Sequence, residues 1–236
     1  MSLPTLNSDY TFDLVIPSTG ETVQFRPYLV REEKMLLMAL ESQKSLEMMK
    51  AMKNIIDACF KGVDASKLCL YDVEYCFVNL RAKSAGEIAQ IEYGCSHCGA
   101  DNPIALDLES LKVSDKPESE TIQLTDNIYI KMRYPTLADA IRNPDLFAST
   151  MKANNLIGII SILIDSVMTE DSIIKFADET EAERNNFIES LNSKQFEKIK
   201  KWIEDSPRCS LNIKFTCSSC ETENDVDLVG VQNFFT

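Results

Sequence analysis

The alternation of apolar and polar residues marks two similar segments far apart in the chain. Residues 91–108 read IEYGCSHCGADNPIALDL, and residues 213–230 read IKFTCSSCETENDVDLVG. In both, apolar residues alternate with polar ones before and after a C-x-x-C turn, which predicts a strand, a tight turn and a return strand. An offset of 122 positions places Cys95 on Cys217 and Cys98 on Cys220. We therefore expect two hairpins of the same design.

The match between the two parts of the chain continues upstream of the cysteines. Helical spacing of apolar residues predicts a helix over 71–83 and another over 194–205, with Ser193 as the N-cap of the second. The segment VQFR (23–26) also resembles IKMR (130–133), at an offset of 107. We interpret the pattern as a tandem duplication of a β-hairpin, helices and a C-x-x-C hairpin. Two unrelated hairpins with a chance match are the alternative.

Further elements follow from the same patterns. Apolar alternation predicts hairpins over 10–26 and 121–133, while helical spacing predicts a helix after Pro27, with a stripe of Leu36, Leu37 and Leu40. Longer apolar patterns predict helices over 45–60 and 152–167, the latter matching the former with Asp165 in the place of Asp57. An acidic insertion, 170–192, carries helix-forming patches around Ile173–Ile174 and Phe187–Leu191.

The predicted fold class is α+β, and the predicted division is into two repeats. The polar segment 114–120 contains Pro117 and is the most linker-like stretch of the chain. The first repeat is expected to span 1–118 and the second 119–236, with the acidic insertion lying in the second. One Cys₄ zinc site, built from zinc-ribbon-like hairpins, would join the two halves.

Composition and charge narrow the function classes. The chain of 236 residues has a formal net charge of −13, which argues against wrapping nucleic acid, because phosphate binding needs excess Lys and Arg. Its first residues lack the basic start and apolar run of a signal peptide, and the apolar stretch 156–167 is too short to span a membrane. We therefore expect a protein of a reducing cytoplasm, where eight cysteines mean metal ligands or core thiols and not disulfides.

The cysteines are the clearest candidate chemistry. Cys95, Cys98, Cys217 and Cys220 supply the four soft ligands of a closed structural zinc site, which leaves no open position for substrate. Two half-sites completed across a homodimer, bare turns without metal, and an iron–sulfur centre are the alternatives. The other thiols of the helical region are expected to be buried and not ligands; they are Cys59, Cys69 and Cys76.

Little in the sequence points to catalysis. His97 is the only histidine and lies within the first C-x-x-C, where its counterpart is Ser219, so we expect an exposed turn residue. No glycine-rich phosphate loop is present, and no carboxylate pair stands out. Flexible methionines and terminal aromatics are the candidate partner contacts, although core packing is the alternative for the helix; these residues are Met48, Met52, Phe234 and Phe235.

The motifs together resemble a family of phage proteins. FRPYLVREEKMLLMALES, the downstream II-D-A-C-F helix and the paired CSHC and CSSC turns are similar to the baseplate proteins of T-even-like contractile-tailed bacteriophages, over about Phe12 to Phe235. The resemblance implies a baseplate hub component, or a factor that promotes hub assembly, without enzymatic activity. It also implies contacts with other tail proteins, and a location in the host cytoplasm during assembly or in the virion.

Two other function classes compete with this interpretation. A zinc-ribbon module that binds nucleic acid or acts in transcription should carry Lys and Arg beside its turns, but the flanks here read ADNP and ETENDVD. A metal hydrolase needs an open coordination position and a general base, which four cysteines do not provide. Neither membrane nor nucleic acid is therefore an expected partner, and a homo-oligomer is compatible with the sequence.

Overall fold

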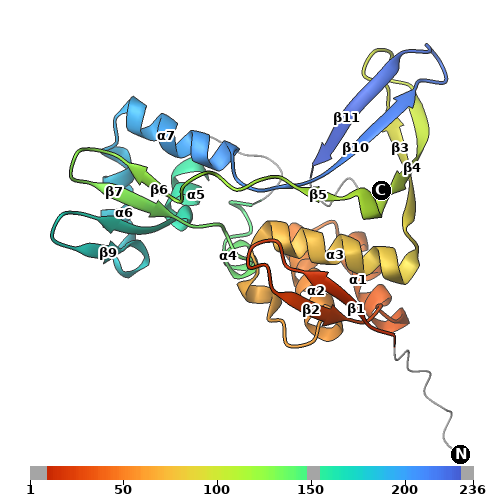
Figure 1. Cartoon of the computed structure of the whole chain (residues 1–236), viewed down its shortest axis with the longest axis horizontal. Helices are drawn as coiled ribbons and strands as arrows, with labels where there is room; N and C mark the ends of the chain where they lie inside the picture. Colours follow the sequence, from red (N-terminus) through yellow and green to blue (C-terminus); the bar gives the residue numbers. More distant parts are fainter. Residues whose placement is uncertain (1–9, 148–154, 230–236) are drawn as a thin grey trace, which may run out of the picture. The chain divides into compact units, whose positions relative to one another are not determined.

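The computed structural model describes residues 10–147 and 155–229, and these combine helices with antiparallel sheets (Figure 1). The predicted α+β class is confirmed. The chain divides into two compact units. Unit 1 contains Met1–Ser114 and Arg208–Thr236, and unit 2 contains Asp115–Pro207. Among the described residues, no helix combines the length and apolar content of a membrane span.

The helical part of unit 1 begins with a hairpin and continues with three helices. Strands β1 (Phe12–Val15) and β2 (Thr22–Phe25) pair antiparallel, as the apolar alternation predicts. Helices α1 (Val30–Ser42), α2 (Ser45–Cys59) and α3 (Leu70–Ala85) follow, close to their predicted bounds. The core is apolar because one stripe of each helix turns inward; its fully buried members include Ile55, Ile56, Phe77 and Leu80.

The predicted apolar stripe of α1 is wrong in part. Leu36 is buried, but Leu37 is 53% exposed and Leu40 is 36% exposed. The helix instead buries Glu32, Leu36 and Ala39, which recur at the spacing of one helical face. Leu37 lies about 100° around the helix from Leu36 and so turns away from the core.

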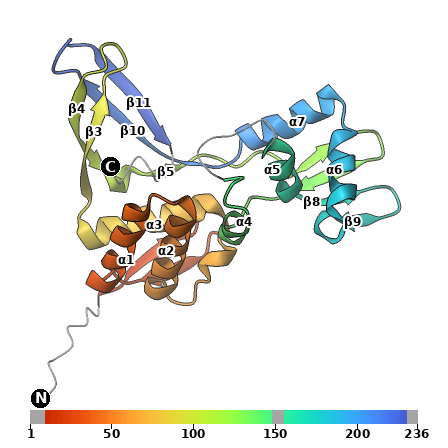
Figure 2. The same ribbon diagram turned by 180° about the vertical axis from the view of Figure 1, so that it is seen from behind.

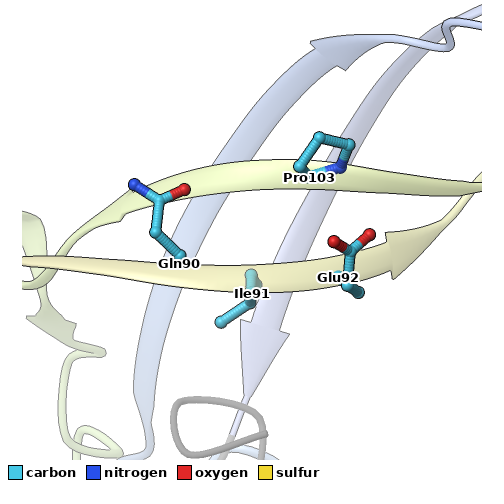
Figure 3. A pocket seen from close by; sticks show the side chains of 4 residues that line it. All are labelled: Gln90, Ile91, Glu92 and Pro103. Carbon is cyan, nitrogen blue, oxygen red and sulfur yellow. The ribbon is translucent and has the colours of Figure 1, made fainter.

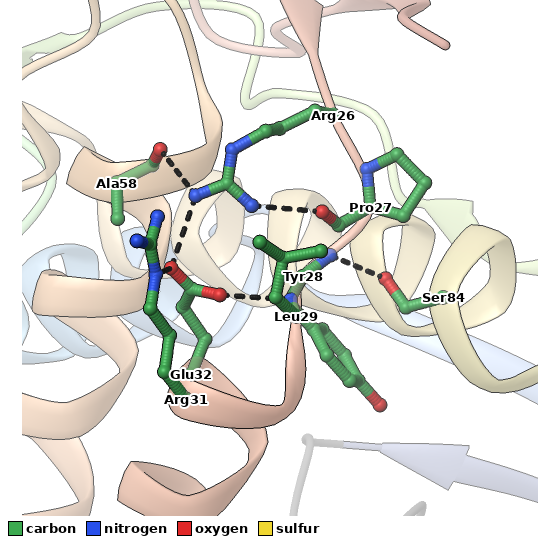
Figure 4. Close-up of polar contacts among 8 residues, drawn as sticks. All are labelled: Arg26, Pro27, Tyr28, Leu29, Arg31, Glu32, Ala58 and Ser84. Atoms are coloured by element: carbon green, nitrogen blue, oxygen red, sulfur yellow. Dashed lines mark hydrogen bonds and ion pairs between the residues drawn. The ribbon is translucent and has the colours of Figure 1, made fainter. Parts of the chain in front are cut away.

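A buried carboxylate connects β2, α1 and α2. Glu32 accepts hydrogen bonds from the Arg26 guanidinium at 3.0 Å, from Arg31 Nε at 2.6 Å and from the Leu29 backbone N–H at 2.8 Å (Figure 4). Arg26 also donates to the carbonyl oxygen of Ala58 at 3.2 Å. Because the Leu29 N–H precedes the first turn of α1, Glu32 also caps this helix, although Leu29 itself has no capping side chain.

The other described part of unit 1 contains the two cysteine hairpins. Strands β3 (Ile88–Gly94) and β4 (Asp101–Asp107) form one, and β10 (Cys209–Thr216) and β11 (Glu223–Val229) form the other. The two hairpins lie side by side (Figure 2). A short strand, β5 (Lys112–Val113), pairs with the start of β10. The predicted strands on either side of each C-x-x-C turn are therefore confirmed.

Unit 2 is a four-stranded antiparallel sheet with helices. Its strand order is β6 (Thr121–Gln123), β7 (Tyr129–Met132), β8 (Ile164–Met168) and β9 (Ile173–Lys175). The helices are α4 (Leu137–Arg142), α5 (Asn155–Leu163), α6 (Glu181–Glu189) and α7 (Ser193–Glu204). Short 3-10 helices span Ala65–Lys67 and Leu108–Ser110 in unit 1 and Phe176–Asp178 in unit 2.

The end of one predicted helix and one predicted helical patch in unit 2 are strands. The predicted helix 152–167 ends at Leu163, and Ile164–Met168 forms β8, which pairs with β7; residues 152–154 lie outside the described residues. Ile173 and Ile174 belong to β9, which pairs with β8. In both segments β-branched residues meet a neighbouring strand, and this pairing overrides the helical spacing.

The start of α7 also differs by one residue from its prediction. Asn192, and not Ser193, is the N-cap: its side chain accepts from the Gln195 N–H at 3.0 Å, while Gln195 Oε1 accepts from the Asn192 N–H at 2.9 Å. This reciprocal pair satisfies two otherwise unpaired backbone donors. The only tryptophan, Trp202, anchors the helix by stacking on Tyr134, with ring centroids 5.1 Å apart.

The compact units do not follow the predicted repeats 1–118 and 119–236. The seam near residue 114 coincides with the start of the linker-like segment, but the second C-x-x-C hairpin belongs to unit 1. Unit 2 is consequently inserted into unit 1. At its entry and exit the Ser114 N–H donates to the Arg208 carbonyl at 3.1 Å, and the Arg208 N–H donates to Ser114 Oγ at 3.1 Å.

Candidate metal centre

Each C-x-x-C segment closes its hairpin with the same backbone hydrogen bonds. The Cys95 N–H donates to the Ala100 carbonyl at 2.9 Å, and the Gly99 N–H donates back to the Cys95 carbonyl at 2.9 Å. In the other hairpin, Cys217 and Glu221 take the places of Cys95 and Gly99, with distances of 2.9 and 3.0 Å. Gly99 and Glu221 both have positive φ, 74° and 60°, because the turn requires a left-handed residue there.

The two turns bring the four predicted cysteines into one cluster. Their Sγ atoms all lie within 4.8 Å of one another. Across the hairpins, Cys95 Sγ is 3.7 Å from Cys220 Sγ, and Cys98 Sγ is 3.6 Å from Cys217 Sγ. A tetrahedral site with Zn–S bonds of about 2.3 Å requires sulfur–sulfur distances of about 3.8 Å. The donor set and its spacing therefore fit a four-coordinate metal ion.

Backbone amides prepare two of the thiols for ligation. The His97 N–H lies 3.5 Å from Cys95 Sγ, and the Ser219 N–H lies 3.4 Å from Cys217 Sγ. The N–H groups of Cys98 and His97 lower the pKa of Cys95 to about 6, against an opposing effect of burial. Those of Cys220 and Ser219 lower the pKa of Cys217 in the same way. Thiolates, the forms that bind metal, are thus favoured at these positions.

An aromatic contact next to the cysteines connects the two hairpins. Tyr93 and Phe215 meet edge to face, with ring centroids 6.2 Å apart. The inward positions beyond them are buried and aliphatic; they include Ile91, Ile104, Leu106, Leu211, Ile213 and Leu228. Alternate residues of each strand face the same side, so the strand register that buries these residues also fixes where the cysteines lie along each hairpin.

The remaining candidate residues supply no ligand atom to the cluster. Cys59 and Cys76 are buried, as predicted, whereas Cys69 is only partly buried. Burial raises the pKa of Cys59 to about 11, so this thiol is a poor ligand and nucleophile. His97 is exposed and contributes its backbone N–H and no ligand atom to the cluster.

The predicted partner contacts differ in accessibility. Met52 is only 8% exposed and packs in the core of unit 1, whereas Met48 is half-buried. Only Met48 of this pair therefore offers an accessible surface. Phe234 and Phe235 lie outside the described residues. A contact role for these four residues stays a prediction.

Sequence reasoning missed two site residues, Asn102 and Asn224. Both are buried, with 3% and 4% exposure, and each donates a side-chain hydrogen bond towards a cysteine of the opposite hairpin. The signal was present in the sequence, because the 122-residue offset places one asparagine on the other. Each occupies an inward position of an alternating strand, where a polar residue needs a buried partner.

Two hollows lie away from the cysteine cluster. A small cavity of about 160 Å³ on the β3–β4 hairpin is lined by Gln90, Ile91, Glu92 and Pro103 (Figure 3). Gln90 and Glu92 leave β3 on the side opposite Ile91, as strand alternation requires. A groove of about 500 Å³ in unit 2 contains the ion pairs Arg133–Asp139 and Lys175–Asp165.

Comparison with known protein families decides the classification. A family model described as T4 bacteriophage base plate protein matches residues 7–236. The chain belongs to this family. It is thus a T4-like phage baseplate protein, as its motifs predicted, and the family supports a structural component of the tail that contacts other tail proteins. No curated protein and no solved structure shows significant similarity to the chain.

Proposed function

We propose that this baseplate protein is a non-enzymatic component of the baseplate hub, or a factor that promotes hub assembly, and that a Cys₄ zinc centre stabilises its partner-binding shape. The observation that carries the proposal is the cluster of four Sγ atoms within 4.8 Å, contributed by residues that are 119 and 125 positions apart. A closed site of four thiolates has no position for substrate, so it serves structure and not hydrolysis.

Zinc is the proposed metal because two C-x-x-C turns at hairpin ends are its usual structural setting. A single iron ion would accept the same four thiolates, and it differs from zinc by its visible absorption. Without metal, the cluster itself would contain no cation to balance the negative charge of its thiolates. Metal binding would therefore contribute to the folding of unit 1.

The charge around the hairpins does not favour the nucleic-acid alternative. The charged residues of the four hairpin strands are all exposed; they are Glu92, Asp101, Asp107, Glu223, Asp225, Asp227 and Lys214. The single lysine is paired with Asp225 at 2.8 Å. Such a surface repels phosphates and suits a basic protein partner.

We further propose that the two halves of the chain arose by duplication. Arg26 and Glu32 at the start of α1 have counterparts in Arg133 and Asp139 at the start of α4, each 107 positions later. Arg133 donates to Asp139 at 2.7 Å, and Asp139 caps α4 through the Thr136 N–H at 2.9 Å. The same local arrangement in both halves supports common ancestry.

The C-terminal part of each half supports the same proposal. Ser84 and Ser206 lie 122 positions apart, and each hydroxyl donates to the carbonyl four residues earlier, at 2.6 and 3.0 Å. The two cysteine hairpins pair in matching register, with Ile91 opposite Ile104 and Ile213 opposite Val226. Under this proposal, β9 and α6 belong to material gained by the second half.

Elemental analysis tests the metal. Full-length protein purified without added metal should contain about one equivalent of zinc and show no visible absorption band. Cys217→Ser should lose the zinc, whereas Cys59→Ser, a matched change at a buried thiol outside the cluster, should retain it. Iron in place of zinc, or protein that folds without bound metal, would contradict the proposed centre.

Assembly assays test the biological role. In cells infected with a phage that lacks this gene, wild-type protein should restore hub assembly, and Cys217→Ser should restore it poorly. Deletion of 231–236 tests the predicted docking role of Phe234 and Phe235: lost assembly with an unchanged melting temperature supports it. Normal assembly by the truncated protein would refute that role.

A further inference from the structure

We propose that Asn102 and Asn224 are reciprocal positioning residues of the metal centre, each holding the turn and the first cysteine of the opposite hairpin in place. This inference rests on the metal centre proposed above and adds to it. The two side chains are not ligands. They act on the metal through Cys217 and Cys95 and through the backbone of the turns.

Asn102 extends from β4 to the turn of the other hairpin. Its Oδ1 accepts hydrogen bonds from the Ser218 N–H at 2.8 Å and from Ser218 Oγ at 3.0 Å. Its Nδ2 donates to the Ala100 carbonyl of its own turn at 2.7 Å, and lies 3.7 Å from Cys217 Sγ. A single buried amide thus connects both turns and one thiol.

Asn224 makes the corresponding contacts from β11. Its Oδ1 accepts from the Ser96 N–H at 3.0 Å and from Ser96 Oγ at 2.7 Å. Its Nδ2 donates to the Thr222 carbonyl at 3.0 Å, and lies 3.5 Å from Cys95 Sγ. The contacts are therefore reciprocal: each asparagine accepts hydrogen bonds from the turn of the other hairpin.

Only an amide side chain of this length meets these requirements. It provides one oxygen that accepts two hydrogen bonds and one nitrogen that donates two. Aspartate would keep the acceptor but lose both donors, and would place a negative charge next to the thiolates. Alanine would leave the N–H groups of Ser96 or Ser218 without their partner.

The hydrogen bonds also divide the four cysteines into two pairs, because the amides reach only one cysteine of each turn. Both amides reach the first cysteine of a C-x-x-C, Cys217 or Cys95, each of which also lies next to a backbone N–H. These two cysteines are buried, whereas Cys98 is exposed and Cys220 is partly exposed. Four thiolates around a divalent ion carry a net charge of −2, so N–H donors directed at sulfur stabilise the loaded site.

Metal affinity and a spectroscopic probe test the proposal. Full-length Asn102→Ala and Asn224→Ala should bind Zn²⁺ about 10- to 100-fold more weakly than wild type, in competition with a chromophoric chelator. The control is Asn212→Ala, because Asn212 is an exposed residue of β10 that bonds Asp225 and Asp227 away from the cluster. Its affinity should stay within about twofold, as expected of a surface change.

Co²⁺ substitution separates a positioning role from a merely structural one. The sulfur-to-cobalt charge-transfer band should shift in Asn102→Asp, which keeps the acceptor for Ser218 but loses the donor to Cys217. Asn212→Ala should leave the band unchanged. Asn102→Asp also covers the case in which the alanine variants fail to fold, because it retains the acceptor for the Ser218 N–H and Oγ.

The outcomes distinguish this inference from the proposed function. If wild type binds zinc but the asparagine variants share its affinity and cobalt spectrum, the positioning role is refuted and the metal centre stands. If wild type binds no metal at all, the proposed centre falls, and this inference falls with it.

Discussion

Removing the charge of Glu32 tests the hydrogen-bonded network that connects β2, α1 and α2. Burial raises the pKa of this carboxyl, but hydrogen bonds from Arg31, Arg26 and the Leu29 N–H outweigh it and hold the pKa at about 2, against an ordinary value of 4.5. A depression of this size corresponds to about 3 kcal/mol of folding free energy at neutral pH. Glu32→Gln should therefore destabilise unit 1 by about 3 kcal/mol at pH 7.

The sign of the pH dependence follows from the depressed pKa. Folding favours the ionised carboxylate, so its contribution is complete above the unfolded-state pKa and disappears as the pH falls through the folded-state value. The gap in free energy between wild type and Glu32→Gln should narrow from pH 4.5 downwards. It should be about half its neutral value at pH 3 and close to zero below pH 2.

The assay must report on unit 1 alone. Trp202 is the only tryptophan and lies in unit 2, so its fluorescence does not follow the Glu32 network. Amide hydrogen exchange of peptides from α1 and α2 reports on this network directly. The expected destabilisation of about 3 kcal/mol corresponds to about a 150-fold loss of protection. The control is Glu47→Gln, since Glu47 forms an exposed pair with Lys50 and should change protection by less than about fivefold.

Two results would refute the reasoning about Glu32. One is protection in α2 that differs less than about threefold between wild type and Glu32→Gln at pH 7, where the full effect is expected. The other is a difference in unfolding free energy between wild type and Glu32→Gln that stays constant between pH 6 and pH 3. A constant gap would mean that shape, and not charge, accounts for the loss.

Other expectations follow from the described contacts. Asn192→Ala should destabilise unit 2 by about 1 kcal/mol in urea unfolding followed by Trp202 fluorescence, because it removes the cap of α7; an equal loss in Ser193→Ala would contradict that cap. Trp202→Phe keeps an aromatic ring against Tyr134 but loses the 3.0 Å bond from Nε1 to the Ser119 carbonyl, so it should lower stability by about 1 kcal/mol, measured by far-ultraviolet circular dichroism. Chelation of the proposed metal should reduce hydrogen-exchange protection in the cysteine hairpins and leave α7 unchanged; equal losses in both would argue against a local role for such a metal.

The cysteine hairpins were predictable because several signals agree there. Strand alternation, turn residues and a fixed offset of 122 positions all point to the same two structures. The reciprocal asparagines follow the same offset, but their role depends on how the hairpins face each other. Alternation predicts that Asn102 and Asn224 point inward and does not reveal which atoms they meet.

Other elements could not be assigned from local pattern. The apolar run that ends α5 continues into β8, and a short run of this kind fits a buried helix or a buried strand equally well. Pairing with β7 decides the outcome at Ile164, and this contact lies more than thirty residues away in sequence. At α7, Asn192 and Ser193 are adjacent residues that both make good caps, so the sequence leaves the boundary uncertain by one position.

Because unit 2 is inserted between Ser114 and Arg208, the ribosome synthesises the two cysteine hairpins at different times. Cys98 emerges 119 residues before Cys217, which at typical rates of synthesis is an interval of about 6 to 24 seconds. During that time all of unit 2 is made, and the first hairpin has no opposite turn to supply Cys217, Cys220 and the Ser218 N–H that meets Asn102. The four thiols therefore cannot come together until all of unit 2 and the second C-x-x-C turn have been translated.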